Sequence, residues 1–201
     1  MKIDSHLTLT VLCPGEKRLE ALQRQWDKDL KTLKDSGEFD AIPASVVAMD
    51  SSPFNVSSIV CLAEMENNSI LLMGDGRTDD TIKALKAKGL LPEGNTISFD
   101  IVKLPHHGSK RNIKEDFFDR VTAKNWVISA DGSNDNPDDT VLDFISNKIA
   151  NGNVWITNRE GEKSLGKKIE KFLSNCSPTL KVHFLDGKPS MIINLQDKVD
   201  F

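Results

Sequence analysis

The sequence has no apolar run long enough to cross a membrane and no surplus of basic charge. Its 201 residues carry 26 Lys and Arg against 30 Asp and Glu, which gives a formal net charge of −4. Without surplus positive charge, a protein does not hold nucleic acid non-specifically through its phosphates. A membrane-spanning helix needs about 18 or more consecutive apolar residues, and no such run occurs. We therefore expect no membrane partner, and nucleic acid only as a substrate.

Cysteine is scarce, and its three copies lie far apart. Cys13, Cys61 and Cys176 each fall in or beside an apolar stretch, which favours buried thiols over disulfides. The first residues also lack the apolar core of a signal peptide. These features fit a reducing compartment, and we expect the chain to be cytoplasmic.

Several motifs of common enzyme classes are missing. The sequence has no Gly-x-x-x-x-Gly-Lys-Ser/Thr loop, no Gly-x-Gly-x-x-Gly loop and no Gly-x-Ser-x-Gly elbow. Ser109 lies close to His107, but residues so near in sequence rarely have the geometry of a catalytic pair. These absences disfavour nucleotide-binding domains and hydrolases that use a serine nucleophile.

The sequence does contain a regular alternation of strand and helix patterns. Strands are predicted at 7–13, 56–64, 69–73, 99–104, 126–130, 154–157, 179–185 and 190–195, and helices at 16–36, 78–88, 112–122, 139–150 and 165–173. This order predicts an α/β layer structure. We expect one domain over residues 1–201, with a loop-rich insertion at 38–55.

The first candidate for chemistry is the loop Gly74-Asp75-Gly76, which follows a buried strand. The glycines leave room for a ligand, and the carboxylate of Asp75 is an oxygen donor that can bind one metal ion or bridge two. The alternative is a simple turn, because Gly-Asp-Gly is common in loops.

The second candidate is the run Pro105-His106-His107-Gly108-Ser109, which follows the next buried strand. Imidazole is a common metal ligand, and one of two adjacent histidines can ligate while the other orients it or meets substrate. Ser109 and the following Lys110 are candidates for binding an anionic substrate. The alternatives are two solvated loop histidines and a solvated basic cluster, which consists of Lys103, Lys110, Arg111 and Lys114.

The two loops together make a stronger prediction than either loop alone. They end consecutive strands and lie about 30 residues apart. Sites in open α/β sheets form at the carboxyl ends of strands, and parallel neighbours would bring Asp75 and His107 to the same edge.

Three segments carry a family resemblance: NVSSIV at 55–60, ILLMGD at 70–75 and VKLPHHGS at 102–109. They resemble the metallo-β-lactamase superfamily, and within it the hydrolase domain of bacterial competence (DNA-uptake channel) proteins. The resemblance covers roughly residues 55–160. It implies a four-layer αββα sandwich, of which this chain would carry the C-terminal part and would be incomplete.

The resemblance also implies roles for residues. Asp75 would bridge two metal ions, zinc or another divalent metal, and His107 would be a terminal ligand, so that both are catalytic. His106, Ser109 and Lys110 would face the substrate, a phosphodiester or a related ester, which a metal-bound hydroxide would hydrolyse.

Two departures from the family pattern stand out. The His-x-His-x-Asp-His motif, which supplies most of the metal ligands in the family, is absent, and in relatives it lies upstream of this chain's first residue. Asn136 stands where relatives often carry histidine, and the isolated His6 and His183 are predicted to be structural. Asp75 and His107 supply two ligands, fewer than the three that a catalytic zinc usually takes from protein.

Three hypotheses follow. The chain is a fragment, binding metal weakly or not at all alone, and becomes an active hydrolase with an N-terminal complement of the fold. Alternatively, it is a catalytically inactive binding or oligomerisation module, in which a homo-oligomer covers the exposed sheet. The third is an unrelated α/β domain with helices on both faces of its sheet.

Overall fold

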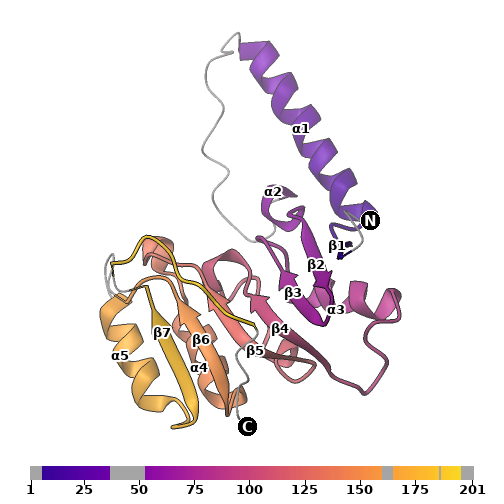
Figure 1. Ribbon diagram of the computed structural model, residues 1–201. Helices are drawn as coiled ribbons and strands as arrows, with labels where there is room; N and C mark the ends of the chain where they lie inside the picture. The colour runs from indigo at the N-terminus through magenta and orange to yellow at the C-terminus, as the bar shows by residue number, and fades with distance from the viewer. Residues whose placement is uncertain (1–5, 37–52, 160–164, 186, 196–201) are drawn as a thin grey trace.

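The computed structural model describes residues 6–36, 53–159, 165–185 and 187–195 (Figure 1). Within them, seven strands form one mixed sheet in the order β1-β2-β3-β4-β5-β6-β7, so that consecutive strands are always neighbours. The predicted α/β class is therefore confirmed. The predicted insertion at 38–55 lies almost entirely outside the described residues, apart from its last part in α2 (Pro53–Val56).

The sheet begins with an antiparallel meander of β1 (Leu7–Cys13), β2 (Val60–Met65) and β3 (Asn68–Leu72). The predicted hairpin is confirmed: Met65 pairs with Asn68 across a two-residue connection. The strands β4 to β7 then run parallel to β3. Their bounds are β4 (Ile97–Lys103), β5 (Val121–Ile128), β6 (Gly152–Ile156) and β7 (Leu180–Phe184).

Three helices connect the parallel strands and lie on one face of the sheet, behind it in Figure 1. They are α3 (Thr78–Ala87), α4 (Asp139–Lys148) and α5 (Leu165–Asn175). Crossover connections between parallel strands are nearly always right-handed. Because the strand order always advances in the same direction, right-handed crossovers bring every connecting helix to the same face. This argues against the unrelated α/β domain with helices on both faces.

The core lies between these helices and the sheet. One register row of side chains faces them, with Leu62, Leu71, Val102, Trp126 and Val154 paired strand to strand. None of these five is more than 2% exposed. Burying such side chains contributes roughly 1.5–3 kcal/mol each, so this face holds the fold together.

The other face of the sheet, here called the open face, has no helix over it among the described residues (Figure 1). The neighbouring register row points that way: Val11, Cys61, Leu72, Lys103, Val127, Trp155 and His183. Val11 is 54% exposed and Leu72 43%. The extended residues 187–195, here called the C-terminal strap, cross part of this face in front of β5 and β6.

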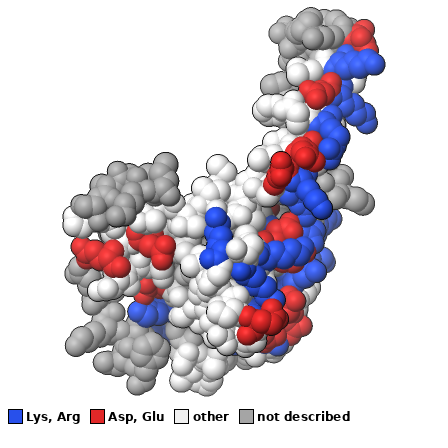
Figure 2. All heavy atoms as spheres, turned by 90° about the vertical axis from the view of Figure 1, so that its right-hand side faces the viewer, with Lys and Arg blue, Asp and Glu red and all other residues white. Residues whose placement is uncertain are grey.

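Helix α1 (Glu16–Ser36) has the predicted bounds and projects from the body (Figure 1). Arg18 ties its first turn to Asp80 of α3 at 2.7 Å. Its apolar stripe is half exposed, with Leu19 at 49% and Trp26 at 52%. Figure 2 shows acidic and basic residues interleaved along it and over the adjoining body, so this side carries no patch of one sign. No described helix is long and apolar enough to cross a membrane.

Two predicted elements are wrong. Residues 112–122 do not form a helix: a short turn, η2 (Glu115–Phe117), leads directly into β5. Residues 190–195 do not form a strand, because the strap crosses the sheet without joining its ladder.

Candidate functional site

Two loops meet at the carboxyl ends of the parallel neighbours β3 and β4. Gly74-Asp75-Gly76 follows β3, and the short turn η1 (His106–Gly108) follows β4. The His106 backbone N–H donates to the Gly74 carbonyl at 3.0 Å, which joins the loops directly. The predicted convergence of the two loops on one rim is therefore confirmed at the level of the backbone.

Both glycines of the first loop are required by its packing. Gly74 has φ +50, and a Cβ there would lie 3.0 Å from the Ile59 carbonyl oxygen. A Cβ on Gly76 would lie 2.5 Å from Cγ2 of Val60, a fully buried side chain. The loop is thus more than a surface turn, because its glycines let it press against the start of β2 and hold Asp75 at the rim.

Buried Asn112 links the first loop to His106. Its Nδ2 donates to the Asp75 carbonyl at 2.8 Å, and its Oδ1 lies 2.9 Å from Nδ1 of His106. Because the amide end is used on a carbonyl, Oδ1 must accept, and Nδ1 of His106 must carry a proton. In the neutral ring, the lone pair of His106 is then on Nε2.

His107 is fixed in the same way by a different partner. Its Nδ1 contacts the carbonyl oxygen of Ser129, which follows β5. Since a carbonyl only accepts, Nδ1 carries a proton, and in the neutral form of this exposed ring the lone pair is on Nε2. Metal-binding histidines are commonly held in this manner, with the second ring nitrogen donating to a carbonyl or carboxylate.

Unusual backbone angles are concentrated here. His106 has φ 46 and His107 φ 56, and the next loop adds Asn134 at φ 53 and Asp135 at φ 65. Only Glu66 shares this left-handed conformation among the other described non-glycine residues. Each such residue costs of order 1–3 kcal/mol unless its surroundings enforce it, and such residues cluster at functional sites.

A third loop, after β5, packs against the second. The Asp138 backbone N–H donates to the Gly108 carbonyl at 3.0 Å, and a Cβ on Gly108 would lie 2.8 Å from Cβ of Pro137. Lys168 of α5, only 8% exposed, holds this loop by donating to the Asp135 carbonyl at 2.6 Å. Three strand ends therefore build one continuous rim.

Charged groups of this rim influence one another. Lys103, half-buried on the open face, has its pKa lowered by burial, and the nearby Asp75 carboxylate offsets part of that effect. Hydrogen bonds from Ser133 hold the pKa of Asp131 below its usual range, and the charge of His107 adds to the effect. Asp75 thus lies near the sheet's open face, and Asp131 lies near His107.

The residues predicted to bind substrate lie close by. Ser109 is only 5% exposed, and its backbone N–H closes the η1 turn on the His106 carbonyl at 3.0 Å. Lys110 is exposed, with its ammonium 3.7 Å from Asp138. Lys114, from the same basic cluster, lies 3.6 Å from Asp79. These ion pairs fit the solvated alternative for that cluster, and the substrate contacts remain predictions.

Several residues of the rim carried no signal in the sequence. Asn112, Asp131 and Lys168 fall on no repeated spacing and belong to no motif. Asn136 is buried at 8%, and its backbone N–H donates to the Ser133 carbonyl at 3.1 Å, so it belongs to the third loop's turn.

The donor types at the rim suit a divalent metal, since neutral imidazole nitrogens and a carboxylate are the usual ligands of zinc. Their number is insufficient: no group of three or more His, Cys, Asp and Glu side chains that could hold an ion occurs among residues 6–36, 53–159, 165–185 and 187–195. We derive no catalytic step for the described residues alone.

Comparisons with known proteins add no assignment. No protein-family model matches the chain, and no curated protein and no solved structure matches it either. The metallo-β-lactamase resemblance therefore remains a prediction carried by the residues themselves.

Proposed function

We propose that this chain forms one half of a metal-dependent hydrolase of the metallo-β-lactamase kind, acting on a phosphodiester or a related ester. The observation that carries the proposal is the orientation of the two histidines. Asn112 and Ser129 each accept the Nδ1 proton, which in the neutral rings places the lone pairs of His106 and His107 on Nε2, beside the Asp75 loop. Solvated loop histidines have no need of such partners.

The open face supports the idea of a missing half. It shows apolar side chains such as Val11, Met65 and Leu72, which are 54%, 51% and 43% exposed. An apolar sheet face rarely stays in water, because it promotes aggregation unless another layer packs on it. A second β-layer on this face would turn the sheet with its helices into an αββα sandwich.

That second layer would also complete the site. Asp75 and Nε2 of His107 would be ligands from this chain, and the covering layer would supply the others. A bound metal ion would activate water for attack on the ester. Lys103, which lies on the open face near Asp75, would be enclosed by the same layer and would sit beside the anionic substrate.

Zinc titration followed by NMR of the histidine rings tests the ligand assignment. Nε2 of His106 and His107 should shift on zinc addition, while the ring of His183 should not. The free protein offers an internal control, because Asn153 Oδ1 accepts from Nε2 of His183, which should therefore be the opposite tautomer. Equal zinc shifts at all rings, or Nε2–H tautomers at the rim, would refute the assignment.

Metal content tests the activity. The protein purified from its native cells, together with whatever covers the open face, should contain zinc, manganese or iron by elemental analysis. Asp75→Asn and His107→Gln should remove metal and hydrolysis of bis-(p-nitrophenyl) phosphate, whereas the matched Asp116→Asn, at an exposed carboxylate outside the rim, and His183→Gln should retain both. A metal-free assembly would overturn the proposal.

The lack of a three-donor group in the part of the chain that the structure describes favours a second candidate, a catalytically inactive binding or oligomerisation module that uses the same open face. In that case a second copy or a partner covers the face, and Asp75 and His107 are dispensable. The double variant Asp75→Ala/His107→Ala would keep the biological activity of such a module and would abolish that of the hydrolase.

A further inference from the structure

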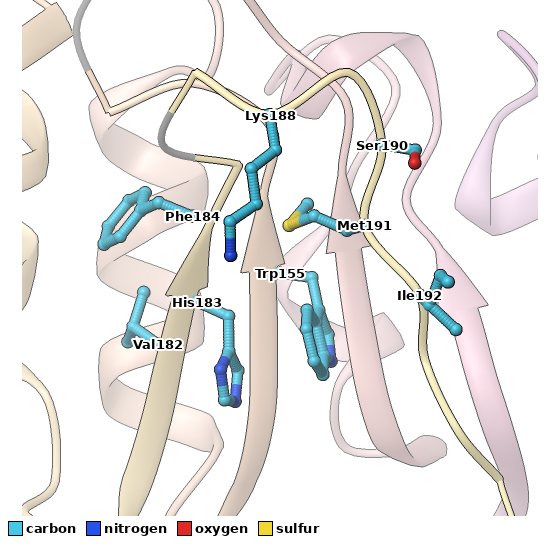
Figure 3. A pocket seen from close by; sticks show the side chains of 8 residues that line it. All are labelled: Trp155, Val182, His183, Phe184, Lys188, Ser190, Met191 and Ile192. Carbon is cyan, nitrogen blue, oxygen red and sulfur yellow. The ribbon is translucent and has the colours of Figure 1, made fainter.

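A cavity of about 500 Å³ lies at the other end of the open face, between the sheet and the C-terminal strap. The residues that line it come from β6, β7 and the strap (Figure 3): Trp155, Val182, His183, Phe184, Lys188, Ser190, Met191 and Ile192. Neither candidate loop of the rim contributes to it. Its volume is within the range of roughly 300–1,000 Å³ that is typical of small-molecule sites.

Two aromatic rings make up the floor of this cavity. Trp155 and His183 pair across β6 and β7, and their rings stack with centroids 4.0 Å apart and an interplanar angle of 14°. The indole N–H of Trp155 donates to Asn125 Oδ1 at 2.9 Å, and Nε2 of His183 lies 2.9 Å from Asn153 Oδ1. The rings are therefore held rigidly, with these polar edges satisfied.

The floor carries little charge. Burial, with a smaller effect from the positive charge of Lys181, lowers the pKa of His183 below its usual value. The imidazole is then mostly neutral at pH 7. Met191, Ile192 and Phe184 add apolar and polarisable surface around the two rings.

Among the described lining residues, Lys188 alone carries a charged side chain. A tight turn fixes its backbone, since its N–H donates to the Leu185 carbonyl at 3.0 Å and Gly187 has φ +74. Figure 3 shows its side chain extended into the space above His183, with the ammonium near the ring. None of the eight described lining residues is acidic, so one cation stands beside two aromatic rings and aliphatic side chains with no carboxylate among them.

We propose that this cavity binds a small aromatic carboxylate, independently of the hydrolase proposed above. The carboxylate pairs with the ammonium of Lys188, and the aromatic body packs on Trp155 and Met191. A charge-assisted contact beside an aromatic surface gives both orientation and selectivity for an anion. The cavity lies over the C-terminal halves of β6 and β7, whereas Asp75 and His107 follow the ends of β3 and β4.

The test is an NMR titration of the full chain with 2-naphthoate, using the neutral 2-naphthamide as its matched ligand. The chain has three tryptophans, so its indole N–H signals report on three separate places. The Trp155 signal, identified with Trp155→Phe, should shift and saturate, while those of Trp26 and Trp126 stay in place. Naphthamide should bind about tenfold more weakly.

Substitution of Lys188 distinguishes specific binding in the cavity from non-specific adsorption on the protein surface. Lys188→Gln should weaken naphthoate binding about tenfold and leave naphthamide binding unchanged. The matched Lys181→Gln, an exposed lysine on β7 outside the lining, should change neither. Both variants should keep the wild-type spectrum, because both lysines are exposed.

Three results would overturn the proposal: no saturable shift at Trp155, equal affinities for the acid and the amide, or unchanged naphthoate binding in Lys188→Gln. A shift at Trp26 alone would mean adsorption on the exposed stripe of α1. None of these readouts depends on metal or on hydrolysis, so the outcome does not bear on the proposed hydrolase.

Discussion

Leu71 and Leu72 are neighbours in β3, yet they meet entirely different surroundings. Leu71 faces the helices and is fully buried, whereas Leu72 faces the open side and is 43% exposed. Both are leucines on the same strand, so composition does not separate the two faces. The separation comes from the strand order, which always advances in one direction and so brings α3, α4 and α5 to one face.

The comparison shows that helices bury one face of the sheet while much of the other face stays exposed. The helical face has no more than 2% exposure along its central row. The open face keeps apolar side chains that nothing among the described residues buries, apart from the part beneath the strap. Stability should therefore depend on the first face, and association on the second.

The largest effect should come from the buried leucine. Leu71→Ala removes packing from a filled core and should lower the free energy of unfolding by about 2–5 kcal/mol. Leu72→Ala, one residue along, should lower it by less than about 1 kcal/mol, because the side chain is already in water. Chemical denaturation measures both. Equal losses would mean that the two faces are not different in the free chain.

Charges placed on the open face sharpen the comparison. Val11→Asp with Leu72→Asp should weaken the assembly of any covering layer at least about 100-fold, because carboxylates would be buried without partners. Two added carboxylates on the helical layer, Asn147→Asp with Ser174→Asp, are the matched control, since both residues are exposed. Sedimentation of the native protein, with its melting temperature, measures the effect; no change in either would contradict a covered face.

Lowering the pH should remove the stability that the ionised Asp79 carboxylate gives to the helical layer. Asp79 lies in the first turn of α3, with its carboxylate 2.9 Å from the guanidinium of Arg77. Burial raises the pKa of Asp79, but the hydrogen bond and charge of Arg77, with Lys114, outweigh burial and bring it down from 3.8 to about 2. The resulting stability is present above pH 4 and is lost as the pH falls towards 2.

With allowance for solvent screening, we expect this contribution to be about 1 kcal/mol at pH 7. Asp79→Asn should show that loss at pH 7 and none near pH 2. The measurement is the free energy of unfolding of both proteins across this range. A constant difference at every pH would contradict the role of ionisation.

The smallest expected effect is an increase, not a decrease, in the free energy of unfolding. His107 has φ 56, so His107→Gly relieves an unfavourable conformation and should raise the free energy of unfolding by up to about 1 kcal/mol. His183→Gly, in the regular strand β7, should lower it by about 1 kcal/mol. Denaturant midpoints give the order, and a His107→Gly protein less stable than His183→Gly would contradict it.

Much of the fold could be predicted from sequence because its periodicity is strong. Both β1 and α1 have the predicted bounds, since alternating Thr and apolar residues end at Pro14-Gly15 and a 3.6-residue stripe follows. The predicted helix at 112–122 was wrong because tertiary contacts outweighed local preference. Phe117 and Phe118 both pack on Trp126, and the side chain of Asn112 donates a hydrogen bond to the Asp75 carbonyl at the rim.

The strap misled the prediction in another way. Residues 190–195 alternate like a strand, but alternation indicates only that one side is covered, not that a neighbouring strand is present. Here the covered side lies against the sheet face instead of in its ladder.

One part of the candidate site could be predicted from the sequence and another part could not. The meeting of the Asp75 and His106 loops follows from parallel strands in sequence order, which could be read from the pattern of elements. The partners that orient the rings could not, because Ser129 uses only its backbone carbonyl and Asn112 is an isolated side chain. His183, predicted as structural, does lie in a strand, but its stacking on Trp155 depends on a register invisible in one sequence.

Most of helix α1 lies far from the ion pair that ties its first turn to the body. Its 21 residues span about 32 Å, while its ion pair to the body lies in the first turn, at Arg18. A tilt of 10° about that anchor would carry the far tip, about 27 Å away, through about 5 Å, roughly the spacing between two strands. The packing of α1 against α2 opposes such a tilt, which would otherwise move the half-exposed Trp26 and Leu30.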